Sequence, residues 1–126
     1  MTDSVDRLHE AVIAARHADP STSRTARLLR SGRSKMAKKL AEEAVEVVID
    51  AMHGNRDAVV RESADLLYNL VVLWVSTGIA PKEVWKEMER RERLMGIAEK
   101  VPKDLGDVDS RRKVVALESR RVRKRR

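Results

Sequence analysis

Between residues 35 and 77 the chain has a helical residue pattern that is broken at one place, Gly54 and Asn55. Before the break, apolar residues recur at about 100° per residue, opposite an arc of Lys, Glu and Asp. After it, residues 64–75 are apolar on almost every side. Glycine commonly ends a helix, and asparagine commonly caps the start of one. The sequence therefore predicts two long helices that a tight turn joins into an antiparallel hairpin.

Further helices are expected on both sides of this hairpin, over residues 4–17, 25–30 and 81–95, with Ser34 as the cap of the hairpin's first helix. Aromatic residues make up 2% of the chain, which disfavours a β-sandwich or barrel. The helix that is apolar all round must be covered, and a chain of 126 residues covers it most easily with a second copy of itself, so we expect a homodimer or a higher homo-oligomer. The predicted fold class is all-α, a helical bundle built on the hairpin and completed by dimerisation.

The net charge of +7 is concentrated in the last part of the chain. Residues 103–126 carry a net charge of +6, which leaves +1 for residues 1–102. We therefore expect a helical domain over residues 1–100 and a basic tail over residues 101–126. The tail is predicted to begin as a linker and to form a last, sparsely apolar helix from about Asp109.

The chain contains no cysteine, which excludes disulfides, a thiolate zinc site and a cysteine nucleophile. Three acids among the first ten residues argue against a signal peptide. No apolar run has the length that a bilayer requires. These features predict a cytoplasmic protein without a membrane partner.

Four carboxylates are arranged symmetrically about Gly54. Glu46 lies eight residues before it and Glu62 eight after it, so each stands about 12 Å from the turn at a rise of about 1.5 Å per residue. Glu43 and Asp65 lie eleven residues before and after it and form a second pair about one turn further along. We expect all four side chains to converge across the hairpin, where their mutual repulsion requires a proton or a cation.

Carboxylates without a cysteine or a histidine pair favour a hard cation, Mg²⁺ or alternatively Mn²⁺. The predicted metal ligands are Glu43, Glu46, Glu62 and Asp65, and Glu42 is a candidate ligand for a second ion. The alternative is a solvated, acidic helix face, which is common. Against this alternative, Glu62 and Asp65 interrupt a helix that is otherwise apolar, where an unpaired carboxylate is costly.

Lysine side chains precede the acids on the first long helix, Lys35 and Lys39 among them. Cations beside a divalent metal suit the binding of a phosphate chain. The spacing fits ion pairs within the helix equally well, Lys38 with Glu42 and Lys39 with Glu43. The spacing alone leaves both interpretations open.

The chain resembles the phosphoribosyl-ATP pyrophosphohydrolases in the order and spacing of four segments: SRTARLL at residues 23–29, KMAKKLAEEAVEVVID at residues 35–50, ESADLLYNLVVLW at residues 62–74 and RRERLMGIAEK at residues 90–100. The resemblance covers about residues 5–100. It implies a MazG-like, all-α pyrophosphohydrolase fold in which dimerisation completes the bundle.

The resemblance also implies a ligand set and a reaction. Mg²⁺ would be held by the acids that match the family motif, which are Glu43, Glu46, Glu62 and Asp65, with Glu42 nearby. The implied reaction cleaves phosphoribosyl-ATP between its α and β phosphates and gives phosphoribosyl-AMP and pyrophosphate, the second step of histidine biosynthesis. Glu42 or Glu46 is expected to orient the attacking water.

The candidate substrate-binding residues are Lys35, Lys39 and Arg24, which are expected to hold the outer phosphates, and Asn69. Three positions near the expected substrate depart from the family pattern. Arg24 replaces an aromatic residue, Ala41 replaces a glycine, and Asn69 replaces a histidine. The departures leave the acids of the motif intact, so they bear on the choice of nucleotide more than on the reaction.

Two other functions remain open at this point. One is a housecleaning enzyme of the same superfamily that hydrolyses another nucleoside triphosphate. The other is a non-catalytic helical dimer whose basic tail binds nucleic acid. The tail has no aromatic residues between its charges to stack on bases, and Tyr68 is expected to be a core or dimer contact rather than a stacking platform.

Overall fold

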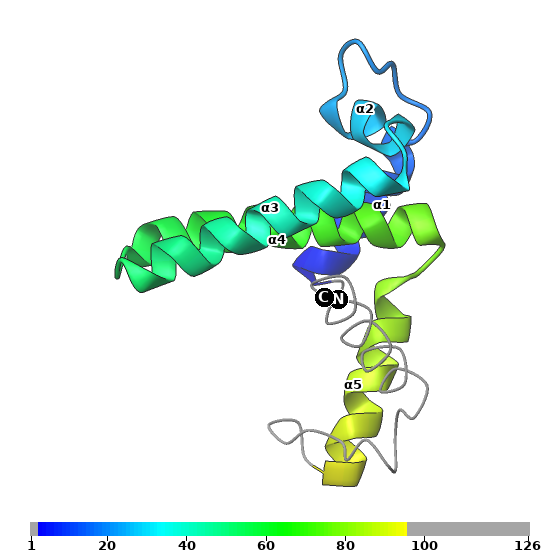
Figure 1. Cartoon of the computed structure of the whole chain (residues 1–126). Helices are drawn as coiled ribbons and strands as arrows, with labels where there is room; N and C mark the ends of the chain where they lie inside the picture. The colour runs from blue at the N-terminus through cyan, green and yellow to red at the C-terminus, as the bar shows by residue number, and fades with distance from the viewer. Residues whose placement is uncertain (1–2, 96–126) are drawn as a thin grey trace, which may run out of the picture. The chain divides into compact units, whose positions relative to one another are not determined.

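The computed structural model describes residues 3–95, and all regular secondary structure in this range is α-helical (Figure 1). The helices are α1 (Ser4–Ala15), α2 (Arg24–Arg30), α3 (Arg33–Met52), α4 (Arg56–Thr77) and α5 (Pro81–Met95). The predicted all-α class is confirmed for this part of the chain. The linker and the last helix predicted for the tail, and the domain boundary predicted near residue 100, lie outside the described residues.

The chain divides into two compact units, Met1–Glu83 and Val84–Arg126. In the first unit, α3 and α4 lie side by side as the predicted antiparallel hairpin, and α1 and α2 pack against it (Figure 1). Within residues 3–95, no single helix is long and apolar enough to cross a membrane.

The ends of the hairpin helices show why the chain turns where it does. Asn55 accepts a hydrogen bond from the Ala58 N–H at 3.2 Å, so the predicted cap of α4 is confirmed. Gly78 ends α4 at φ 77°, a left-handed conformation that favours glycine. The predicted cap at Ser34 is wrong, because α3 begins at Arg33, two residues before the start that this cap predicts, and its N-cap is Gly32 at φ 98°.

The core of the first unit is built on the C-terminal half of α4. Val71 and Val72 are fully buried and Val75 is nearly so. They pack against Val12 of α1 and Met36 of α3. This half of the strongly apolar helix is therefore covered within the chain, by α1, α2 and the start of α3.

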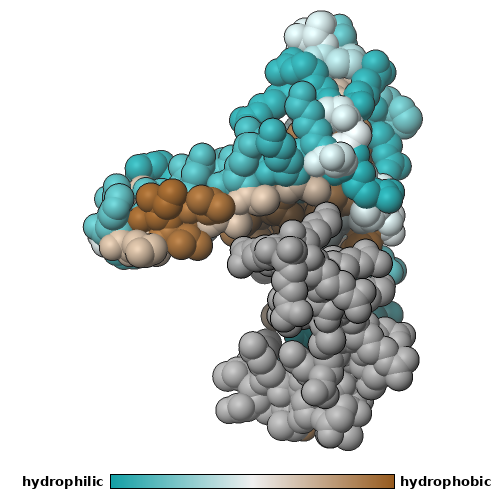
Figure 2. Space-filling view, in the orientation of Figure 1, coloured by the Kyte–Doolittle hydropathy of each residue, from teal (hydrophilic) through white to brown (hydrophobic). Residues whose placement is uncertain are grey.

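The turn end of the hairpin has the opposite character. Figure 2 shows hydrophobic side chains gathered on the surface there. Their exposed fractions lie between 47% and 81%, and no described element covers them. The residues are Val45, Val48, Ile49 and Met52 of α3 and Val60 of α4.

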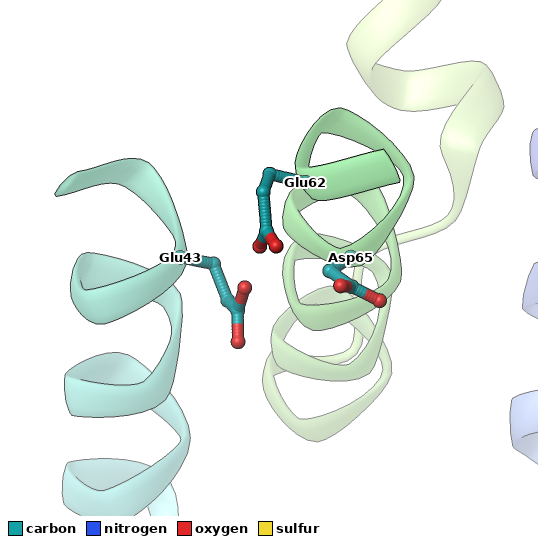
Figure 3. A group of neighbouring side chains, drawn as sticks. All are labelled: Glu43, Glu62 and Asp65. Atoms are coloured by element: carbon teal, nitrogen blue, oxygen red, sulfur yellow. The ribbon is translucent and has the colours of Figure 1, made fainter. Parts of the chain in front are cut away.

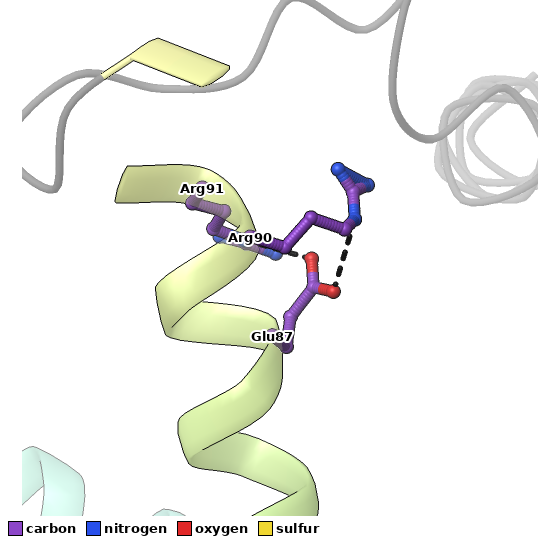
Figure 4. A network of polar contacts seen from close by, with 3 residues as sticks. All are labelled: Glu87, Arg90 and Arg91. Carbon is purple, nitrogen blue, oxygen red and sulfur yellow. Dashed lines mark hydrogen bonds and ion pairs between the residues drawn. The ribbon is translucent and has the colours of Figure 1, made fainter. Parts of the chain in front are cut away.

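Helix α5 carries a network of charges on its own surface (Figure 4). Glu87 accepts a hydrogen bond from Arg91 Nε at 3.1 Å, and its other oxygen lies 3.3 Å from Arg90 Nε. Pairs three and four residues apart stabilise a helix by about 0.2–0.5 kcal/mol each. These contacts support a helix that is rich in charged residues.

Candidate metal centre

Three carboxylates meet in the middle of the hairpin, one from α3 and two from α4 (Figure 3). One oxygen from each of Glu43, Glu62 and Asp65 lies within 4.8 Å of the other two. In Figure 3, Glu43 points from α3 towards α4, and Glu62 points back towards it. The symmetric spacing of these acids about the turn is what brings them together in an antiparallel hairpin.

The cluster is electrostatically unfavourable by itself. Glu43 is 8% exposed, and its burial, with the carboxylate of Glu46 nearby, raises the pKa of its carboxyl. A hydrogen bond with the Glu46 carboxyl, together with burial, raises the pKa of Glu62 to about 7. Crowded carboxylates disfavour their charged forms. At neutral pH the cluster therefore retains a proton or takes up a cation.

Two oxygens of the cluster also lack hydrogen bonds. Glu43 Oε2 and Glu62 Oε2 are buried and accept no hydrogen bond from the described part of the chain. A buried acceptor without a donor costs free energy that a bound cation recovers. The donor atoms are all carboxylate oxygens, which match a hard divalent cation rather than zinc. The residues present thus fit the type of metal expected from the sequence.

Glu46 lies at the edge of this cluster, and Glu42 lies near Glu46 on the exposed surface of α3. The Glu46 carboxyl is near enough to those of Glu43 and Glu62 to share hydrogen bonds with them, but it is not among the three that meet within 4.8 Å. Both Glu46 and Glu42 are exposed, and they line an open hollow on α3 together with Lys38. The structure thus groups three of the four predicted ligands and leaves these two acids accessible to solvent.

The candidate phosphate-binding lysines lie on α3, ahead of the acids. Lys35 is exposed and Lys39 is half-buried. No ion pair within residues 3–95 joins Lys39 to Glu43 or Lys38 to Glu42. The two ion pairs within the helix that the sequence left open are therefore not formed, and neither Lys35 nor Lys39 has an ion-pair partner among the described residues.

Arg24 begins α2 and lies over the ring of Tyr68, with its Cζ 5.9 Å from the ring centroid. Tyr68 follows Asp65 by three residues, so this contact is about one helical turn along α4 from the cluster. Sequence reasoning assigned no role at the site to Tyr68. Its spacing from Asp65, which puts both on nearly the same face of a helix, is the signal that could have identified it.

Asn69 is 2% exposed and lies one turn beyond Asp65 on α4. Its Nδ2 donates to the backbone carbonyl of Asp65 at 2.8 Å. Its Oδ1 is buried and accepts no hydrogen bond from any described residue. The Asn69 side chain is thus hydrogen-bonded to the turn of α4 that carries Asp65, and its Oδ1 can accept a hydrogen bond from another group.

The sequence model of a family described as phosphoribosyl-ATP pyrophosphohydrolase matches residues 5–92. The match covers more than half of the chain and includes every residue of the acid cluster. The chain belongs to the phosphoribosyl-ATP pyrophosphohydrolase family. The resemblance carried by the four sequence segments is therefore confirmed.

Two members of the phosphoribosyl-ATP pyrophosphohydrolase family match this chain along its whole length. The phosphoribosyl-ATP pyrophosphatase 2 of Rhodopseudomonas palustris is 63% identical over 131 positions, which cover 100% of both chains. The protein of the same name from Bradyrhizobium diazoefficiens is 62% identical over 133 positions and 99% of both chains. The phosphoribosyl-ATP pyrophosphatase of Gluconobacter oxydans is 51% identical over 96 residues, 76% of this chain and 72% of that one. The two full-length matches extend over the basic tail.

Proposed function

We propose that this chain is an enzyme that hydrolyses phosphoribosyl-ATP to phosphoribosyl-AMP and pyrophosphate, the second step of histidine biosynthesis. The observation that carries the proposal is the cluster of Glu43, Glu62 and Asp65, with two buried oxygens that lack donors. It occurs in a chain that is 63% identical over its full length to a phosphoribosyl-ATP pyrophosphatase. Phosphoryl transfer depends mainly on positioning and charge neutralisation, which such a cluster and its cation provide.

Glu43, Glu62 and Asp65 would hold the metal, and Glu46, whose carboxyl adjoins those of Glu43 and Glu62, would be a further ligand. When bound, Mg²⁺, or Mn²⁺ in its place, neutralises charge on phosphate oxygens and lowers the pKa of a coordinated water. Glu42 or Glu46 accepts a hydrogen bond from the attacking water and orients it, since both carboxylates are exposed beside the cluster. The oxygen of this water bonds to the α phosphorus as the bond from that phosphorus to the oxygen that bridges the α and β phosphates breaks. Pyrophosphate leaves with the bridging oxygen, and the proton of the water passes to the orienting carboxylate.

The substrate's phosphates are bound by cations on two helices. Lys35 and Lys39 of α3 and Arg24 of α2 hold the outer phosphates, which places positive charge at the leaving pyrophosphate. Neither Lys35 nor Lys39 forms an ion pair with a described residue, which supports this role. Asn69 offers its Oδ1 to a donor group of the substrate or of a bound water.

We also propose that the enzyme works as a homodimer. The apolar side chains at the turn end of the hairpin have no cover within the described residues, and Met52 is 81% exposed. Exposed apolar patches of this kind mark interaction surfaces, and a second copy brings a matching patch. A chain without cysteine suits the reducing cytoplasm, which is the location we propose.

The direct test is pyrophosphate release by the purified protein in the presence of Mg²⁺. Phosphoribosyl-ATP is offered in parallel with ATP and the common deoxynucleoside triphosphates, and the Glu46→Gln variant serves as the control. We expect turnover of phosphoribosyl-ATP in preference to the others, and its loss in the variant. Preference for another nucleoside triphosphate would identify a housecleaning enzyme instead, and full activity of Glu46→Gln would remove Glu46 from the site.

A further inference from the structure

Two neighbouring residues of α2 hold one tyrosine of α4. The guanidinium of Arg24 lies over the face of the Tyr68 ring, 5.9 Å from its centroid. The hydroxyl oxygens of Thr25 and Tyr68 are 2.6 Å apart and share a hydrogen bond. Tyr68 is therefore fixed at its ring face and at its hydroxyl by adjacent positions of the same helix.

The start of α2 is itself fixed. Ser23 accepts a hydrogen bond from the Ala26 N–H at 3.1 Å and caps the helix. Tyr68 packs against the buried core of the first unit with its half-buried ring. The Tyr68 ring below the Arg24 guanidinium is thus held in place by its packing against the core and by the hydrogen bond between its hydroxyl and that of Thr25.

The guanidinium of Arg24 is available to bind an anion. The side chain of Arg24 is exposed and forms no ion pair with any described residue. A cation that lies over a ring by cation–π attraction keeps its N–H groups for other partners, and a guanidinium binds two oxygens of one phosphate at once. An arginine that is held over a ring in this way gives up less side-chain freedom when it binds an anion.

We propose that Tyr68 is a positioning residue that holds Arg24 towards the outer phosphates of the nucleotide substrate. The inference rests on the proposed function, since it assumes that a nucleotide's phosphates lie at the acid cluster one turn away on α4. Tyr68 acts through Arg24 and does not touch the reacting atoms.

The test uses the full-length enzyme, phosphoribosyl-ATP as substrate and inorganic pyrophosphate as a binding probe in calorimetry. Arg24→Ala is expected to raise KM and weaken pyrophosphate binding about tenfold, with kcat changed less than about threefold. Tyr68→Leu, which removes the ring, should do nearly the same. Tyr68→Phe, which keeps the ring and loses only the hydroxyl, should have a KM close to that of the wild type. Arg30→Ala, an exposed arginine of the same helix, is the matched control.

The decisive comparison is the double variant Arg24→Ala/Tyr68→Leu. If Tyr68 acts through Arg24, the double variant is no worse than Arg24→Ala alone. Additive losses, or a fall in kcat accompanied by a lower melting temperature in Tyr68→Phe, would overturn the proposal and leave Tyr68 as a structural residue. Pyrophosphate binding is measured without turnover. If the wild-type enzyme does not hydrolyse phosphoribosyl-ATP, the proposed function fails while the binding comparison still decides the role of Tyr68.

Discussion

At the scale of single residues, the raised pKa of Glu62 predicts how the stability of the metal-free protein depends on pH. The pKa rises from 4.5 to about 7, first through the hydrogen bond with the Glu46 carboxyl. Between these pH values the folded chain holds a proton that the unfolded chain has released. The free energy of unfolding should therefore fall as the pH rises from about 4.5 to about 7. Urea unfolding in the presence of a chelator, repeated across this pH range, measures the free energy of unfolding.

The Glu62→Gln variant is the control for this titration. It should show a shallower fall over the same pH window, and a slope identical to that of the wild type would contradict the assignment. Added Mg²⁺ competes with the proton, so its affinity for the wild type should increase as the pH rises towards about 7 and beyond. An affinity that is independent of pH would mean that the metal binds elsewhere.

Removal of a single carboxylate from the cluster should abolish turnover without unfolding the hairpin. Asp65→Asn is expected to lower kcat/KM at least about a hundredfold, since even residues that only orient a metal ligand cost tenfold to a hundredfold when replaced. Because the side chain is exposed, the circular dichroism spectrum should not change. Asp57→Asn, on the exposed first turn of α4, is the matched control and should keep full activity.

At the scale of the helices, the cap of α4 determines how firmly the turn holds the two halves of the acid cluster together. Asn55→Ala removes the acceptor for the Ala58 N–H and should lower the free energy of unfolding by about 1 kcal/mol. Asn55→Asp preserves the acceptor and should cost much less. Equal losses in the two variants, measured by chemical denaturation, would show that the cap hydrogen bond does not stabilise α4.

The sequence was a good guide to the helices because their periodicity and caps are local. The break at Gly54 and Asn55 and the end at Gly78 follow from residue preferences within a few positions. The predicted start of α3 was wrong because serine is the commoner N-cap residue, and Ser34 was therefore chosen. The actual N-cap is Gly32, two residues earlier, which has φ 98° and forms no side-chain hydrogen bond.

The closeness of three of the acids could be predicted from the sequence, whereas the contact of Arg24 with Tyr68 could not. Acids that are placed symmetrically about one turn are brought together by the hairpin alone, so Glu43, Glu62 and Asp65 could be grouped from their spacing. The contact of Arg24 with Tyr68 joins residues more than forty positions apart. It depends on how the loop after α1 sets α2 against α4, which no local pattern encodes.

At the scale of the whole molecule, the exposed turn end of the hairpin predicts self-association. Val48 is 55% exposed in the apolar patch. Val48→Glu places a charge in the proposed interface and should convert the dimer to a monomer, since a buried unpaired charge is strongly unfavourable. Val48→Ala stays apolar and should remain dimeric. Sedimentation analysis measures both, and a monomeric wild-type protein would rule out the interface.

We propose that the three-carboxylate cluster holds the divalent cation on which hydrolysis of phosphoribosyl-ATP depends. The most direct measurement is the rate of pyrophosphate release from phosphoribosyl-ATP as Mg²⁺ is titrated into chelator-treated wild-type protein and Glu43→Gln. We predict no release without metal, a saturable increase in the wild type, and a much higher Mg²⁺ requirement or no activity in the variant. Release that persists without a divalent cation, or the same Mg²⁺ dependence in both proteins, would contradict the claim.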